Sequence, residues 1–126
     1  MIYRANPVPV GVTCTFSVYA KDILDPNFPS VDYLRIGSPW SYYGYPSGAI
    51  GGSWFKLEGA GSIAANTTGA VIQKLPNGWY RCSVTGVSTG AGNFSIGAND
   101  HKYLIWGAQL EIGSAASSYI LSLIHI

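Results

Sequence analysis

The sequence predicts an all-β protein, an antiparallel β-sandwich of the jelly-roll type, and three observations carry this prediction. Several short stretches alternate apolar and polar residues with a period of two, as half-buried strands do. No stretch of ten or more residues has the pattern of an amphipathic helix. The composition also fits, because only 10% of the 126 residues are charged while 16 are glycine and 9 are tyrosine. Many short strands separated by turn signals indicate a sandwich or a barrel.

The first half of the chain contains three predicted strands. The strongest covers residues 13–21, where four small or apolar side chains share one face: Cys14, Phe16, Val18 and Ala20. Two prolines in residues 25–30 then interrupt the pattern. Further strands are predicted at residues 31–37 and 53–59, on either side of an aromatic segment.

The second half begins with a strand at residues 69–75 and a turn signal at Asn77-Gly78. This pair predicts a type I′ hairpin turn, because both residues tolerate positive φ. Behind the turn, residues 79–85 alternate again, followed by a weak strand at 93–98 and a strong one at 102–113. In this last strand we expect one shared face: Leu104, Trp106, Ala108 and Leu110.

The predicted core lies on the apolar faces of these strands. Trp79 or Trp106 should be at least partly buried, because a large aromatic side chain can bury about 150 Å² or more. We expect full burial of five further side chains: Phe16, Val18, Cys82, Val84 and Leu104. Cys14 and Cys82 are the only cysteines, and two buried reduced thiols are favoured over a disulfide between them.

Composition and spacing exclude several classes of function. The net charge of +1 does not suggest the basic surface of a nucleic-acid-binding protein. No apolar run approaches the roughly 18 residues that a membrane-spanning helix needs. The six acidic residues are spread along the chain, whereas a glycosidase needs two carboxylates within about 10 Å of each other. Asp100-His101 is best explained as a solvated turn, since a zinc site needs three or four ligands. We therefore expect no enzymatic activity, no catalytic residue and no metal site.

The segment "SPWSYYGYPSG", residues 38–48, places four large aromatic rings between two prolines. Three roles are open for these rings: lids over the core, contacts between subunits, or platforms on which sugar rings stack. Loops on a rigid sandwich commonly carry binding residues. The candidate carbohydrate-binding residues are these four rings and one tryptophan of the following strand: Trp40, Tyr42, Tyr43, Tyr45 and Trp54.

Two motifs carry a resemblance to a known family. "NGWYRCSVT" and, further along, "YLIWGAQLEIGSAASSYI" together resemble the β-sandwich domain of bacteriophage tail fibre and tail spike proteins. That family is similar in turn to concanavalin A-like and carbohydrate-binding jelly-roll modules. The strand "TFSVYAK" also matches, so the resemblance covers residues 12–120.

The resemblance implies a non-catalytic, lectin-like module of a phage tail fibre that binds glycan on the host surface. Its partners would be a host polysaccharide and other fibre subunits in a homotrimer, in the virion tail or outside the cell. It implies no cofactor, although a structural calcium ion occurs in many such sugar binders. Two alternatives stay open: a purely structural, oligomerising fibre domain, and a carbohydrate-binding module that accompanies a glycoside hydrolase.

The two ends of the chain depart from the family pattern. We expect residues 1–120 to form the sandwich, with at least one N-terminal strand missing, since the chain enters a strong strand almost at once. The family continues with Pro-Thr after "SYI", whereas this chain ends in "LSLIHI". That string resembles the translation of a sequencing adapter in a metagenomic fragment, so residues 121–126 are expected to be a non-native tail. The alternative is a genuine last strand.

Overall fold

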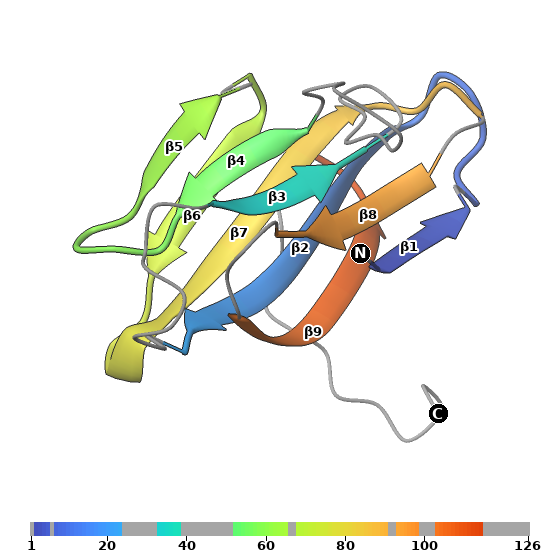
Figure 1. Ribbon diagram of the computed structural model, residues 1–126. Coiled ribbons are helices and arrows are strands. Elements are labelled where there is room, and N and C mark those ends of the chain that lie inside the picture. Colours follow the sequence, from blue (N-terminus) through green and yellow to red (C-terminus); the bar gives the residue numbers. More distant parts are fainter. Residues whose placement is uncertain are drawn as a thin grey trace.

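The protein folds as two antiparallel β-sheets packed face to face, as Figure 1 shows. This arrangement confirms the prediction of an antiparallel all-β sandwich. Within the part of the chain that the structure describes, no helix is long and apolar enough to cross a membrane. The structure is a computed structural model that describes residues 2–5, 7–23, 33–38, 52–65, 68–90, 93–98 and 103–114.

Each sheet combines strands from distant parts of the sequence. The five-stranded sheet contains β1 (Ile2–Ala5), β3 (Leu34–Gly37), β4 (Ser53–Lys56), β5 (Ser62–Ala65) and β8 (Asn93–Gly97), in the order β1-β8-β3-β4-β5. The four-stranded sheet contains β2 (Thr13–Asp22), β6 (Ala70–Lys74), β7 (Trp79–Val87) and β9 (Tyr103–Ile112), in the order β6-β7-β2-β9. The sequence prediction lacks β1 and β5, which lie at the two edges of their sheet and, at four residues each, are too short to show a clear period.

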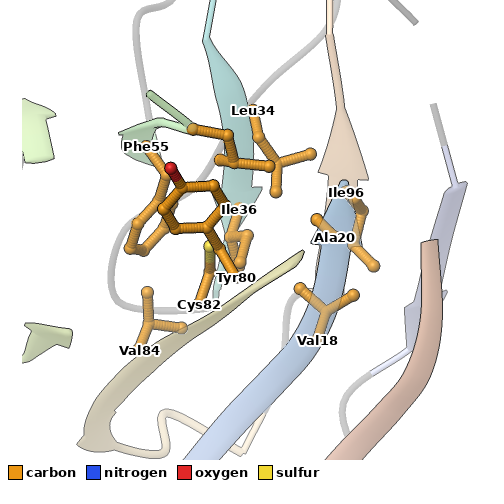
Figure 2. Close-up of a cluster of buried hydrophobic side chains, with 10 residues drawn as sticks. Val18, Ala20, Leu34, Ile36, Phe55, Tyr80, Cys82, Val84 and Ile96 are labelled. Atoms are coloured by element: carbon orange, nitrogen blue, oxygen red, sulfur yellow. The ribbon is translucent and has the colours of Figure 1, made fainter. Parts of the chain in front are cut away.

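The core lies between the sheets and draws apolar side chains from both, as Figure 2 shows. Alternation along each strand aims every second side chain inward, so a period of two in the sequence becomes one buried face. The four-stranded sheet contributes Val18, Ala20, Tyr80, Cys82 and Val84. The five-stranded sheet contributes Leu34, Ile36, Phe55 and Ile96.

The predicted core is largely confirmed, with one clear error. Val18, Cys82 and Val84 are buried as predicted. Phe16 is only partly buried, and its ring centroid lies 5.1 Å from that of Phe94. The prediction for Leu104 is wrong, because this side chain is 49% exposed.

A β-bulge in β9 explains the error at Leu104. Ser17 pairs with Gln109 and Tyr19 with Trp106, so Gly107 and Ala108 both lie opposite the single residue Val18. Gly107 has φ of 64°, which is the left-handed conformation of a bulge that begins with glycine. The extra residue reverses which side chains face inward along the strand.

The bulge divides the predicted face of β9 into two halves. Beyond it, Leu110 packs against the core as predicted, but before it the inward side chains are Tyr103 and Ile105. Leu104 and Trp106 therefore face outward, and Trp106 is 49% exposed. Trp79 is partly buried, which fulfils the expectation for at least one of the two tryptophans.

The hairpin between β6 and β7 has the predicted turn. Asn77 has φ of 63° and ψ of 29°, and Gly78 has φ of 82°, as a type I′ turn requires. The Trp79 N–H donates to the Pro76 carbonyl, and the Leu75 N–H donates to the Trp79 carbonyl at 2.8 Å. The Asn-Gly pair thus fixes the register of the hairpin.

Both cysteines are free and buried, as the sequence predicts. Cys82 pairs with Val18, and Cys14 lies four residues away along the same strand as Val18. That offset corresponds to about 13 Å along the strand, whereas a disulfide joins Cα atoms about 4.4–6.8 Å apart. Burial raises the pKa of both thiols above the ordinary value.

Neither thiol should react with Ellman's reagent in the native protein, because the thiolate is the nucleophile and both groups are buried with a raised pKa. Reaction in concentrated guanidinium chloride should release two equivalents of thionitrobenzoate, one for each cysteine. The release can be followed by absorbance. Rapid reaction of one equivalent without denaturant would contradict this placement of the thiols.

Candidate functional site

Only one of the five candidate binding residues lies in the described part of the chain. Trp40, Tyr42, Tyr43 and Tyr45 lie outside the described residues, so their role stays a prediction. Trp54 is described and lies on β4. Ile36 of β3 pairs with Ser53 of β4, so both ends of the aromatic segment are attached to the same end of this pair of strands.

Trp54 belongs to a group of aromatic and cationic side chains on the outward face of the five-stranded sheet. Arg35 and Trp54 are directly opposite each other on β3 and β4, and they alternate with the inward residues Leu34 and Phe55. The Arg35 guanidinium carbon lies 4.5 Å from the centroid of the Trp54 ring. We name this group the Trp54 cluster, and its members are Tyr33, Arg35, Trp54 and Lys56.

In the same cluster a second cation, Lys56, lies near a second ring, that of Tyr33. The rings of Tyr33 and Trp54 are tilted by 34° with centroids 5.6 Å apart, and Lys56 Nζ lies 5.4 Å from the Tyr33 centroid. Lys56 Nζ also lies 3.7 Å from an Oε2 oxygen of the exposed Glu58. The Nε1 atom of Trp54 is buried and has no hydrogen-bond acceptor within the described ranges. Arg35 is also buried, so the cluster offers ring surface and the Lys56 ammonium group to a ligand, but no nucleophile beside a base.

A second aromatic group, not predicted from the sequence, lies on the outward face of the four-stranded sheet. Tyr19 pairs with Trp106 on one side and with Arg81 on the other, and Arg81 pairs with Gln73. These four side chains form a line across all four strands. We name the first three of them, Trp106, Tyr19 and Arg81, the aromatic row, and Gln73 lies beyond its end on β6.

The aromatic row is a stack of overlapping groups. The rings of Trp106 and Tyr19 are nearly parallel, at 13°, with centroids 4.8 Å apart. The Arg81 guanidinium carbon lies 5.1 Å from the Tyr19 centroid, and Arg81 Nη2 donates to Ser17 Oγ at 3.3 Å. Ring pairs of this kind and cations over rings are each stabilising by about 0.5–1.5 kcal/mol.

Polar side chains occupy the next positions on the same face. Gln109 Nε2 donates to Glu111 Oε1 at 2.6 Å. Thr15 Oγ1 donates to the Gly113 carbonyl at 2.9 Å, so it accepts from Thr85 Oγ1 at 2.8 Å. These groups hold one another in fixed positions beside the aromatic row.

The alternation of β9 predicts Trp106 in the core, and it therefore gives no indication of the aromatic row. One signal was present: Gly107 interrupts a strand of large side chains, and a glycine inside a strand often marks a bulge. A bulge at that point reverses the outward and inward faces and places Trp106 beside Tyr19.

The sequence matches no known protein-family model, and it matches no curated protein. Within the described residues, no group of three or more His, Cys, Asp or Glu side chains could hold a metal ion. Among the described residues, the ring contacts make the Trp54 cluster and the aromatic row the candidate sites, one on the outward face of each sheet.

Proposed function

We propose that this domain is a non-catalytic module of a phage tail fibre that binds glycan on the host surface. The proposed binding surface consists of the Trp54 cluster and the aromatic segment that connects β3 to β4. One observation supports this most: a segment with four aromatic residues connects β3, which Tyr33 directly precedes, to its partner strand β4, which carries Trp54. Tyr33, Trp54 and the four aromatic residues between them thus belong to one continuous stretch of the chain, residues 33–54.

The chemistry of these side chains suits a saccharide. A sugar ring has a face of C–H groups that is attracted to the negative face of an aromatic ring. Its hydroxyl groups, or the carboxylate of an acidic sugar, can accept hydrogen bonds from Lys56 and the Tyr33 hydroxyl. The resemblance to tail fibre domains points to the same class of ligand. By the same proposal, the domain acts in the virion tail or outside the cell, as part of a homotrimeric fibre.

Replacing Trp54 with alanine should weaken glycan binding by roughly tenfold or more, because the ring supplies both stacking surface and the support for Arg35. Trp54→Phe is the matched control, since it retains a ring opposite Arg35 and should keep most of the affinity. A glycan array would identify the ligand, and calorimetry with that ligand would measure both variants. Melting temperatures would show that the variants are folded.

Two results would overturn the proposal. If the parent protein binds no glycan on the array, and Trp54→Ala or Trp40→Ala shifts its sedimentation toward a smaller species, the surface is a subunit contact. If Trp54→Ala and Trp54→Phe bind the identified glycan as tightly as the parent protein, the ligand lies elsewhere.

A further inference from the structure

Trp106 is a large aromatic side chain that the core does not use. It is 49% exposed, and its neighbour Leu104 is exposed to the same degree. Both lie on the outward face of β9, at one edge of the four-stranded sheet. Aromatic and apolar surface gathered in this way commonly marks a site of contact.

The aromatic row determines how a ligand can approach. Two nearly parallel rings with centroids 4.8 Å apart must overlap face to face, because rings lying side by side would be farther apart. Tyr19 therefore has Trp106 against one face and Arg81 toward the other. A ligand ring cannot lie flat on Tyr19, and Trp106, at the outer end of the row, is the ring that offers accessible surface.

Hydrogen-bonding groups lie next to Trp106 on the same face. Gln109 is the next outward residue of β9 after the bulge, and Glu111 is the one after it. Their side chains are joined by a hydrogen bond of 2.6 Å, so the amide and the carboxylate are held in position before any ligand binds. An amide supplies both donor and acceptor, and a carboxylate supplies strong acceptors, which together suit the hydroxyl groups of a sugar.

The composition of this face favours a saccharide over other partners. An apolar peptide or lipid would have to cover Gln109, Glu111 and Arg81, and burying polar groups without partners is costly. The face also mixes Arg81 and Lys21 with Glu111, so it lacks the single-sign charge that attracts nucleic acid or an anionic membrane. A pyranose ring has an apolar C–H face and a polar rim, which matches an aromatic ring beside an amide and a carboxylate.

We propose that the outward face of the four-stranded sheet carries a second saccharide site at its β9 edge, in which a pyranose ring contacts Trp106 and its hydroxyl groups bind Gln109 and Glu111. This site does not rest on the proposed role of the Trp54 cluster, which lies on the other sheet. With both sites occupied, one domain holds two glycan segments on opposite faces. Binding to a dense polysaccharide surface is then strengthened by the second contact, without any change in either site.

The test is residue-resolved NMR of the full chain labelled with ¹⁵N-tryptophan. The indole N–H resonance of Trp106 would be assigned by its loss in Trp106→Phe. The protein is then titrated with the methyl glycosides of glucose, galactose, mannose, N-acetylglucosamine and glucuronic acid. At least one of them should shift the Trp106 resonance, with a dissociation constant on the order of millimolar, as is typical of a single small contact. The resonance of the partly buried Trp79 should stay in place.

Two glutamines of the same face provide matched variants. Gln109→Ala should weaken the interaction by roughly fivefold, the effect of about one hydrogen bond. Gln73→Ala removes the same group on β6, three strands from β9 and outside the aromatic row, and should leave the affinity unchanged.

The outcomes separate the two proposals. A shift at Trp106 without any at Trp54 supports the second site and counts against the first. A shift at Trp54 alone, or no shift at Trp106 with all five glycosides, overturns the second site. Equal effects of Gln109→Ala and Gln73→Ala would also overturn it.

Discussion

Gly69→Ala should destabilise the domain by about 3 kcal/mol or more, enough to unfold a marginally stable protein. A Cβ atom at Gly69 would lie 2.2 Å from the carbonyl oxygen of Thr85, which belongs to the backbone of β7 and cannot move aside. The backbone of Gly69 has φ of 72°, where a side chain adds a further cost of about 1–2 kcal/mol. The Thr85 N–H also donates to the Gly69 carbonyl at 2.8 Å, so relief of the clash would break a hydrogen bond.

Gly59→Ala is the matched control for Gly69→Ala. Gly59 has φ of 58°, but a Cβ atom there would meet nothing within 4 Å. Gly59→Ala should therefore lower the free energy of unfolding only by the penalty for a side chain at positive φ, about 1–2 kcal/mol. Urea unfolding followed by circular dichroism would measure both variants. If Gly69→Ala and Gly59→Ala lowered the free energy of unfolding equally, the close approach of Gly69 to β7 would be contradicted.

Phe55→Ala should lower the free energy of unfolding by about 3–5 kcal/mol, which is the second large effect expected for this protein. Phe55 is among the largest side chains that are completely buried, and it lies in the core between the two sheets (Figure 2). Truncation would remove its apolar contacts and leave a cavity bordered by both sheets. The free energy of unfolding from chemical denaturation is the quantity to compare.

Val71→Ala provides the contrast for Phe55→Ala. Val71 lies on β6 with its side chain 57% exposed, so its truncation should change stability by less than about 0.5 kcal/mol. If Val71→Ala lowered the free energy of unfolding as much as Phe55→Ala, the outward face of the four-stranded sheet would itself have to be covered.

Local sequence patterns determined much of the fold. The alternation in residues 13–21 and 79–85 fixed the buried faces of β2 and β7, because a period of two leaves only one choice of inward residues when one face is apolar. Asn77-Gly78 fixed the turn between β6 and β7, since few other pairs accept positive φ at both positions. The same alternation placed both cysteines on the inward faces, and their free state followed from the general tendency of free cysteines to be buried.

Only the tertiary structure decided where the aromatic side chains lie. The alternation of β9 predicted one apolar face, but the bulge opposite Val18 turned Leu104 and Trp106 outward, and no local period could show that reversal. The short edge strands β1 and β5 form because β8 and β4 offer hydrogen-bond partners, not because four residues have a preference of their own. The Trp54 cluster arises from the register of the consecutive strands β3 and β4, which brings Arg35 over Trp54. The aromatic row arises from pairing between strands far apart in the sequence, which brings Tyr19 between Trp106 and Arg81. Such contacts depend on register between strands far apart in sequence, and that register is set by the packing of the two sheets around one core.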